Sequence, residues 1–136
     1  MIVVDASVMV NAIADNTSDG GRARTALLAD PDLAAPDLIS AEVVSVLRKW
    51  WQKRHLSDEN MREAIANLTE LDVAYYPTLP LMSRAYELRA NLTPYDAAYA
   101  ALAEMLDCPL LTADARMANA PGPNCEFRVI QPSNRQ

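Results

Sequence analysis

Four carboxylates stand where a short apolar run ends or where a helical pattern begins: Asp5, Glu42, Asp96 and Asp114. In an open α/β sheet, ligands bind beyond the carboxyl ends of the strands, and the helices that follow the strands begin at that same edge. We therefore expect the four carboxylates to converge on one acidic site, although as many as 54 residues separate neighbours along the chain.

Such a cluster suits one kind of chemistry. Carboxylates within a few ångströms of one another repel, and this raises their pKa values unless a cation relieves the repulsion. Magnesium and manganese are the natural cations, because they prefer oxygen ligands and are commonly shared with phosphate oxygens. A bound metal can activate a water molecule and stabilise the leaving oxygen of a phosphodiester. The pattern thus indicates metal-dependent phosphodiester hydrolysis.

Each acid also has a purely structural explanation, because carboxylates near helix N-termini are stabilised by unpaired amides and the helix dipole. Thr93 and Asp96 come close to a capping box. Asp37 follows another apolar run and is an alternative member of the cluster, whereas Asp72 and Asp107 sit at predicted helix C-termini and map to the opposite edge. The agreement of all four on one edge favours a functional cluster.

The elements that must position these acids alternate between strands and helices. Apolar or β-branched runs predict strands over residues 2–4, 33–36, 73–76, 109–112 and 127–130. Helical spacing and capping residues predict helices over residues 8–13 (capped by Ser7), 22–29, after Ser40, after Ser57, 80–91, 94–106 and briefly from 114. Residues 16–21 are dense in turn formers and are predicted to be a loop. This alternation is typical of an α/β fold with a parallel sheet covered on both faces.

Size and composition narrow the possibilities further. The 136 residues, 51% of them apolar, suit a single domain spanning 1–136. The net charge of −6 by itself disfavours nucleic-acid binding, but a metal-loaded acidic cluster reverses the local field that a phosphate meets. We find no membrane span and no secretory signal, so a cytoplasmic location is expected.

Cysteine and histidine are scarce. Cys108 and Cys125 are too few for a disulfide framework and lack zinc-like spacing, so we expect buried or partly buried free thiols. His55 is the single histidine, which argues against His-based metal sites and against Ser-His-Asp chemistry.

Four motifs occur in order along nearly the whole chain: Ile-Val-Val-Asp-Ala-Ser at 2–7, Ser-Ala-Glu-Val at 40–43, Thr-Pro-Tyr-Asp-Ala-Ala-Tyr at 93–99 and Leu-Leu-Thr-Ala-Asp at 110–114. Together they resemble the PIN-domain ribonucleases, and most closely the VapC toxins of type II toxin–antitoxin modules. The resemblance implies a three-layer α/β/α fold with a central, mostly parallel sheet of four to five strands. It also implies a magnesium- or manganese-dependent endoribonuclease acting through an acidic quartet.

Transferred residue by residue, the resemblance assigns the quartet to Asp5, Glu42, Asp96 and Asp114. It makes Asp5 and Asp96 the direct metal ligands, with Asp114 assisting and Glu42 helping to hold metal or water. Hydrogen-bonding support would come from Ser7, Thr112 and Asn11, and a phosphate contact from Arg116. Weaker candidates for phosphate contacts are Arg22, Arg24, Arg48, Lys49, Lys53 and Arg54. The resemblance also implies an RNA substrate, a VapB-like antitoxin partner and a homodimer.

Other functions stay open at this point. A stand-alone RNA-processing nuclease and a non-catalytic PIN-fold binding module share the same motifs. A haloacid-dehalogenase-type phosphatase is disfavoured because it needs a second acid where this chain has Ser7, and a receiver domain because no lysine follows a late strand as required. Of the adjacent Trp50 and Trp51, one indole can join the core, and the other is expected at a partner interface, with stacking on a base as the less favoured alternative.

Overall fold

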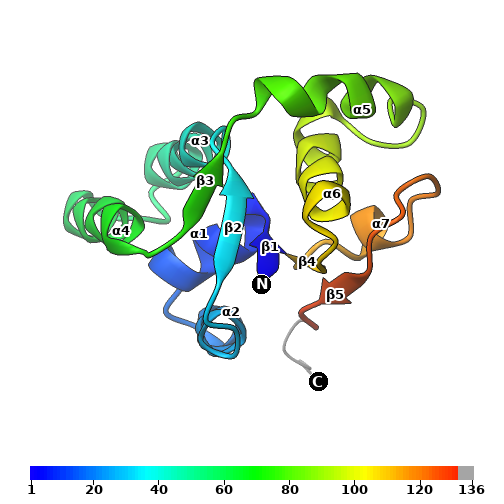
Figure 1. Cartoon of the computed structure of the whole chain (residues 1–136). Helices are drawn as coiled ribbons and strands as arrows, with labels where there is room; N and C mark the ends of the chain where they lie inside the picture. Colours follow the sequence, from blue (N-terminus) through cyan, green and yellow to red (C-terminus); the bar gives the residue numbers. More distant parts are fainter. Residues whose placement is uncertain (132–136) are drawn as a thin grey trace.

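The computed structural model describes residues 1–131 of the chain, and it alternates short strands with helices (Figure 1). The strands are β1 (Ile2–Val4), β2 (Leu33–Pro36), β3 (Ala74–Tyr76), β4 (Leu110–Thr112) and β5 (Phe127–Val129). The helices are α1 (Ala6–Ala14), α2 (Ser18–Leu28), α3 (Ile39–Gln52), α4 (Asp58–Glu70), α5 (Met82–Glu87), α6 (Pro94–Leu106) and α7 (Ala115–Ala118), with a 3₁₀ turn, η1 (Leu79–Leu81), before α5. The predicted α/β class is confirmed.

All five strands are parallel and lie in the order β3-β2-β1-β4-β5. Strand β1 is central, with Val3 opposite Ala34 of β2 on one side and opposite Leu110 of β4 on the other. The chain leaves β1 toward β2 but later returns to β4, so the order reverses between β1 and β4. A crevice opens at the carboxyl ends of the strands at such a switch point.

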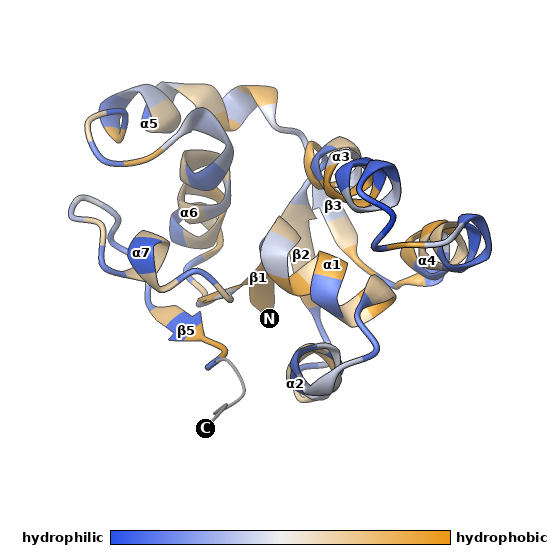
Figure 2. Ribbon diagram, turned by 180° about the vertical axis from the view of Figure 1, so that it is seen from behind, coloured by the Kyte–Doolittle hydropathy of each residue, from blue (hydrophilic) through white to orange (hydrophobic). Residues whose placement is uncertain are grey.

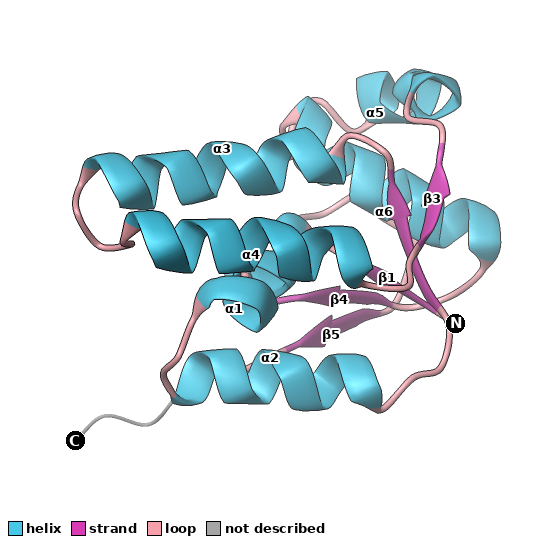
Figure 3. Ribbon diagram, turned by 90° about the vertical axis from the view of Figure 1, so that its left-hand side faces the viewer, coloured by secondary structure: helices cyan, strands magenta, loops and turns pink. Residues whose placement is uncertain are grey.

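Helices cover both faces of the sheet, which confirms the predicted layers. Helices α1 to α4 lie on one side and α5 to α7 on the other (Figure 1). Viewed from the first side, α1 to α4 lie in front of the strands (Figure 3). The outer faces of α3 and α4 are hydrophilic, whereas the strands between the layers are largely apolar (Figure 2). Among residues 1–131, no helix combines the length and apolar character needed to span a membrane.

Burial explains why the short strands hold together. Every residue of β1 is almost fully buried, as expected for the central strand of a parallel sheet covered on both faces. Helix α6 is buried along seven consecutive residues, 97–103, because its many alanines let it pack closely against the sheet and α5. The β-branched strand residues and the alanine-rich helix therefore form the core that fixes the strand ends.

Several helix boundaries differ from the predictions. Helix α2 begins at Ser18, capped by Thr17, so most of the predicted loop is helical. Gly20 lies in it because a Cβ there would come within 1.8 Å of the Asp15 carbonyl oxygen; its lack of a side chain permits close packing rather than a turn. Helix α5 ends at Glu87, well before residue 91.

The cap of α1 is also not the predicted one. Asp5, rather than Ser7, is the N-cap, because its carboxylate accepts the Val8 amide. Helix α3 likewise begins at Ile39, one residue before Ser40, and its N-cap Leu38 makes no side-chain cap bond. In the first case the carboxylate combines a structural cap with membership of the predicted acidic site.

Candidate active site

A cleft of about 320 Å³ opens at the switch point between β1 and β4. Its lining comes from α1, α3, α6 and the ends of β1 and β4. The lining residues are Asp5, Ala6, Ser7, Val10, Asn11, Glu42, Val46, Trp50, Asp96, Tyr99 and Asp114. All four carboxylates singled out in the sequence therefore face one cavity, together with two of the three polar residues expected to support them.

Asp5 directly follows β1 and is only 5% exposed. Its Oδ1 accepts hydrogen bonds from the Ser7 hydroxyl at 2.6 Å and from the Val8 amide at 3.1 Å. Its Oδ2 accepts a hydrogen bond from the Thr112 hydroxyl at the end of β4. Three donors, two from the first turn of α1 and one from the end of β4, thus fix the orientation of this buried carboxylate.

The two hydroxyl groups also join the ends of β1 and β4. Ser7 Oγ accepts the Ala113 amide at 3.1 Å, and Thr112 Oγ1 accepts the Asp114 amide at 3.0 Å. Each hydroxyl therefore donates to Asp5 while it accepts from the backbone that follows β4. This arrangement links the position of Asp114 to that of Asp5 through two short side chains.

Glu42 reaches the cleft from the first turn of α3, where the helix dipole favours an acid. The Tyr99 hydroxyl of α6 donates to Glu42 Oε1 at 2.8 Å, and Tyr99 is only 1% exposed. Burial and the facing carboxylates raise the pKa of Tyr99 far above its ordinary range, so the phenol keeps its proton and remains a donor. Tyr99 thereby orients Glu42 across the cleft.

Asp96 and Asp114 complete the acidic lining from two helix N-termini. Thr93 caps α6 by accepting the Asp96 amide at 3.1 Å, which leaves the half-buried Asp96 carboxylate directed at the cleft. Asp114 caps α7 by accepting the Arg116 amide at 3.0 Å. The guanidinium of Arg116, 94% exposed, lies 3.5 Å from Asp114 Oδ1 at the rim. Asp114 is therefore a helix cap and a cleft residue at once, whereas Asp96 lies in the first turn of α6 behind the cap Thr93.

The cleft concentrates negative charge. Burial raises the pKa values of Asp5, Glu42 and Asp96, and the neighbouring carboxylates add to the effect. For Asp96 the main neighbour is Asp114, and for Asp5 it is Asp96. A divalent cation in the cleft would relieve this repulsion and favour the ionised forms.

The donors present are carboxylate and hydroxyl oxygens, which suit a hard divalent cation. Within residues 1–131, however, no three side chains of Asp, Glu, His or Cys gather closely enough to surround one metal ion. Magnesium needs no such cage, because it retains several waters and usually binds one or two carboxylates. The lining thus fits a partly hydrated ion, and Asp96 is coupled electrostatically to both Asp5 and Asp114.

Other acids from the sequence lie elsewhere. Asp37 follows β2 at the same edge, but its Oδ1 accepts the Thr78 hydroxyl at 2.6 Å and the Thr78 amide at 3.1 Å, and Asp37 does not line the cleft. Asp72 and Asp107 lie at other pockets, away from the acidic lining.

Several basic candidates also have structural partners. Arg24 donates to the carbonyl oxygens of Ala12 and Asp15, and Arg22 to that of Gln131. Neither is part of the cleft lining.

The two aromatic residues of the cleft were not assigned to the site from the sequence. Tyr99 follows Asp96 by three residues, a spacing that places both on one face of α6. Trp50 follows Glu42 by eight residues, close to two helical turns, and therefore shares its face of α3. In both cases, the helical spacing from an acid of the cluster was the sequence signal that could have placed the aromatic residue in the cleft.

The chain is similar to known proteins over nearly its whole length. Residues 2–123 match the family model described as PIN domain. The chain is 40% identical to ribonuclease VapC9 of Mycobacterium tuberculosis over 130 residues, covering 96% of this chain and 98% of the relative. It is 41% identical to ribonuclease VapC1 of the same organism, covering 95% and 97%.

A solved structure of VapBC2 from Rickettsia felis, bound to a DNA fragment from its promoter, has the same fold. The TM-score is 0.66 at 17% identity, and the match covers 96% of this chain and 100% of that one. The fold and the acidic cleft define a PIN-type nuclease. With these matches over nearly its whole length, the chain belongs to the PIN-domain family, among the VapC ribonucleases.

Proposed function

We propose that this chain is an endoribonuclease that hydrolyses RNA phosphodiesters with the help of magnesium or manganese, acting as the toxin of a toxin–antitoxin pair. The observation that carries the proposal is the convergence of four carboxylates on one cleft in a chain about 40% identical to VapC ribonucleases. Residues 1–136 act as one domain in this proposal.

In this function Asp5 and Asp96 hold the ion, and Asp114 assists them. Ser7 and Thr112 keep the Asp5 carboxylate in a fixed orientation through the hydrogen bonds already described. Asn11 lines the same cleft and supplies a further polar group toward bound water. When bound, the ion supplies an activated water and charge stabilisation at the leaving oxygen.

Glu42 has a different role from the ligands. Its Oε1 is occupied by the Tyr99 hydroxyl, so its orientation is set from α6 while the other carboxylate oxygen is left for the cleft. Burial raises the pKa of Glu42, which makes this carboxylate a better proton acceptor than an exposed one. Glu42 therefore positions the attacking water and accepts its proton.

Arg116 is suited to the substrate side of the reaction. Its guanidinium is almost fully exposed and lies beside Asp114 at the rim of the cleft. A guanidinium offers a planar fork of donors to phosphate oxygens. Arg116 would contact a phosphate of the RNA next to the acidic centre.

The partners follow from the relatives. One solved structure with this fold, from Klebsiella pneumoniae, is a toxin–antitoxin complex. We infer for this chain a VapB-like antitoxin, a cytoplasmic location and a homodimeric state. A small neighbouring reading frame with a DNA-binding N-terminus and an arginine-bearing tail would support the toxin role, and its absence would favour a stand-alone RNA-processing nuclease.

Cleavage of RNA by the purified protein tests the proposed activity. We expect cleavage of single-stranded RNA that requires added magnesium or manganese, stops on chelation with EDTA and resumes when the metal is restored. Failure of the wild-type protein to cleave any RNA with either metal present would contradict the assignment and favour a non-catalytic binding module.

A further inference from the structure

The acidic cleft extends beyond its carboxylates along α3. Glu42, Val46 and Trp50 follow one another at intervals of four residues and all line the cleft. At a rise of about 1.5 Å per residue, Trp50 lies roughly 12 Å along the helix from Glu42. The indole is only partly buried, so one side packs on the core while the cleft reaches another. The cleft therefore has an acidic end and an aromatic end.

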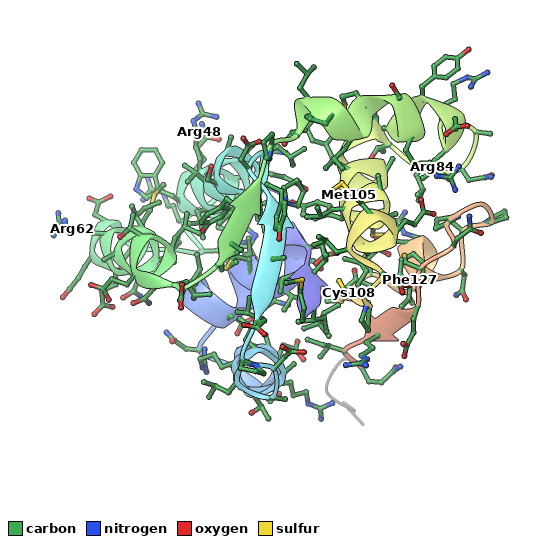
Figure 4. The ribbon with its side chains drawn as sticks, viewed as in Figure 1. Arg48, Arg62, Arg84, Met105, Cys108 and Phe127 are labelled. Atoms are coloured by element: carbon green, nitrogen blue, oxygen red, sulfur yellow. The ribbon has the colours of Figure 1, made fainter. Side chains whose placement is uncertain are left out.

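Positive charge collects beyond the aromatic end. Residues 48–62 carry five of the 12 Lys and Arg side chains of the chain but only two of its 18 acids. The five are Arg48, Lys49, Lys53, Arg54 and Arg62, and all are exposed. In the described part of the chain none of the five forms an ion pair. Figure 4 shows Arg48 and Arg62 directed outward from α3 and α4. This region departs from the overall charge of −6.

Two of these cations share the helical face of the acidic site. Lys49 and Lys53 follow Glu42 by seven and eleven residues, so on a helix they project within about 20° of it. Glu42, Lys49 and Trp50 thus belong to one stripe of α3. The stripe changes from acidic to aromatic and cationic along its length.

Just after helix α3, Arg54 lies at a left-handed backbone position that favours glycine. His55 and Arg54 close the helix by donating to the carbonyl oxygens of Trp50 and Trp51, the pattern of a Schellman cap. Arg54 takes the left-handed position, with φ of 61°. A side chain there costs about 1 kcal/mol relative to glycine. Arg54 thus places a positive charge near Trp50, although its backbone conformation lowers the stability of the fold.

We propose that the α3 stripe is a binding track for single-stranded RNA, in which Trp50 stacks on a base beyond the scissile phosphate, Lys49 contacts the backbone before that base and Lys53 the backbone after it. This inference rests on the proposed function. Aromatic rings beside a cationic groove are the general means of binding single strands, because every base has a face on which to stack. A row of exposed cations also matches a polyanion better than an apolar partner.

Trp51 offers a matched control. It is 43% exposed on another face of α3, and its indole nitrogen donates to Asp58 of α4 at 2.5 Å. It does not line the acidic cleft. Replacement of Trp50 and of Trp51 therefore removes the same side chain from adjacent positions, only one of which faces the proposed track.

Steady-state cleavage of a short single-stranded oligoribonucleotide tests the track. Trp50→Ala should raise KM about 10-fold, the effect of losing one base–aromatic stack, with little change in kcat. Trp50→Phe should restore most of the KM, and Trp51→Ala should leave it within about 2-fold of wild type. An unchanged KM in Trp50→Ala, or an equal rise in Trp51→Ala, overturns the inference while wild-type cleavage upholds the proposed function.

A binding measurement keeps the test independent of catalysis and of folding. In the variant Asp96→Asn with Trp51→Phe, Trp50 is the only tryptophan, and its fluorescence should be quenched by the same RNA. Lys49→Gln with Lys53→Gln should reduce the slope of log Kd against log salt by one to two, whereas Arg89→Gln should not. RNA binding without quenching, or an unchanged salt slope, contradicts the track.

A second inference comes from the opposite end of the sheet. Leu110 of β4 pairs with Phe127 of β5, so Cys108 and Cys125 stand opposite each other two residues earlier in both strands. The Leu110 amide donates to the Glu126 carbonyl at 2.9 Å, which shows that the pairing extends toward them. Both thiols pack against the same core cluster and line the same pocket, so they lie on one side of the sheet. Figure 4 shows Cys108 near β5 and Phe127.

We infer that Cys108 and Cys125 form a disulfide when a hydroperoxide oxidises the protein. Neighbouring strands lie about 4.8 Å apart, within the range of Cα separations of about 4.4–6.8 Å that disulfides span. One thiolate attacks the peroxide, whose O–O bond breaks to give a sulfenic acid and water. The second thiolate displaces hydroxide from that sulfur, so two thiols lose two electrons and two protons while hydrogen peroxide becomes two waters.

The surroundings set the speed of this reaction. Burial, followed by the nearby Glu104 carboxylate, raises the pKa of Cys125 to about 11. Burial also raises the pKa of Cys108. Because the thiolate is the reactive form, oxidation should be slow at neutral pH and faster in alkaline buffer. The cross-link would close the loop that contains α7 and tie the start of β4 to β5.

Mass spectrometry of the intact protein tests the pair. Hydrogen peroxide should lower the mass by two hydrogens, remove both free thiols and raise Tm by roughly 5–10 °C, all reversed by dithiothreitol. Cys108→Ser and Cys125→Ser should each abolish the mass loss. Addition of oxygen to one cysteine while the other stays free, or cross-linking between chains, overturns the inference.

Discussion

Asp5 and Asp37 occupy equivalent places at the ends of neighbouring strands, but their surroundings differ. Each directly follows its strand, β1 or β2, and each accepts a threonine hydroxyl, from Thr112 or from Thr78. Asp5 is 5% exposed and lines the cleft at the switch point, whereas Asp37 is exposed and connects β2 to the segment after β3.

The difference lies in strand order. Strands β1 and β4 are neighbours, but the chain runs from β1 to β2 on one side and from β4 to β5 on the other. The segments that follow β1 and β4 therefore diverge and leave a crevice. Strands β2 and β3 follow one another in the same direction across the sheet, and the segment after β3 returns to contact Asp37. The same residue type at the same sheet edge thus serves a cleft in one place and a loop contact in the other.

The largest expected effect is on the rate of RNA cleavage, which should depend on the carboxylates of the cleft but not on Asp37. Asp96→Asn and Asp5→Asn should each reduce RNA cleavage on the order of 10²-fold or more, the effect of losing one electrostatic group from an active site. Asp37→Asn should stay within about 2-fold of wild type. Initial rates with magnesium, and thermal melts to confirm folding, measure this. Equal losses in all three variants would show that the edge as a whole, rather than the cleft, matters.

The next effect concerns the two threonines. Thr112→Val keeps the shape of a fully buried side chain but removes a donor to Asp5 and an acceptor for the Asp114 amide. We expect a loss of about 2 kcal/mol in unfolding free energy and slower cleavage. Thr78→Val, at a less buried site, should cost about half as much and leave cleavage intact. Urea unfolding with parallel activity assays distinguishes them, and equal costs would contradict the comparison.

A smaller effect is expected at the far wall of the cleft. Tyr99→Phe removes the donor that orients Glu42 but keeps the buried ring. Cleavage should fall about 10-fold, as is typical when a group that orients a metal-site residue is lost. Tyr86→Phe, at an exposed tyrosine, is the matched control. The pH–rate profile adds a specific readout, because loss of this hydrogen bond should move the acidic limb upward; an unchanged profile would leave Tyr99 with a packing role only.

The smallest effect is a pH dependence of stability. Burial raises the folded-state pKa values of Asp5, Glu42 and Asp96 above their unfolded values. Their contribution is fully present below the unfolded values, about 4, and is lost as the pH rises through the folded ones. The metal-free protein should therefore lose stability from about pH 4 upward, and Asp96→Asn should flatten the slope. Chemical denaturation in EDTA across this range measures it, and a rise in stability would contradict the pKa directions.

Added magnesium provides the complementary measurement. Because an ion bound only by the folded state stabilises it by mass action, magnesium should raise Tm at neutral pH in the wild type. The rise should be much smaller in Asp96→Asn and unchanged in Asp37→Asn.

The sequence supported the fold to a large extent. The strands predicted over residues 2–4 and 33–36 have their predicted bounds, and the strand predicted over 109–112 begins one residue later, because short apolar runs are bounded by clear breaks. The loop predicted over 16–21 was largely wrong, because residues that favour turns in isolation are helical where α2 packs closely on α1. Local preference was overridden there by tertiary contact.

What the sequence determined by itself was the set of acids, because a carboxylate after a strand or in a first helical turn can be read from neighbouring residues. Tertiary structure alone distinguished Asp5 from Asp37, added Tyr99 and Trp50 to the cleft, and set Cys108 opposite Cys125. These facts depend on strand order and register, which join residues distant in the chain. Local patterns specify which groups a chain carries at an edge, and only the folded topology decides which of them meet.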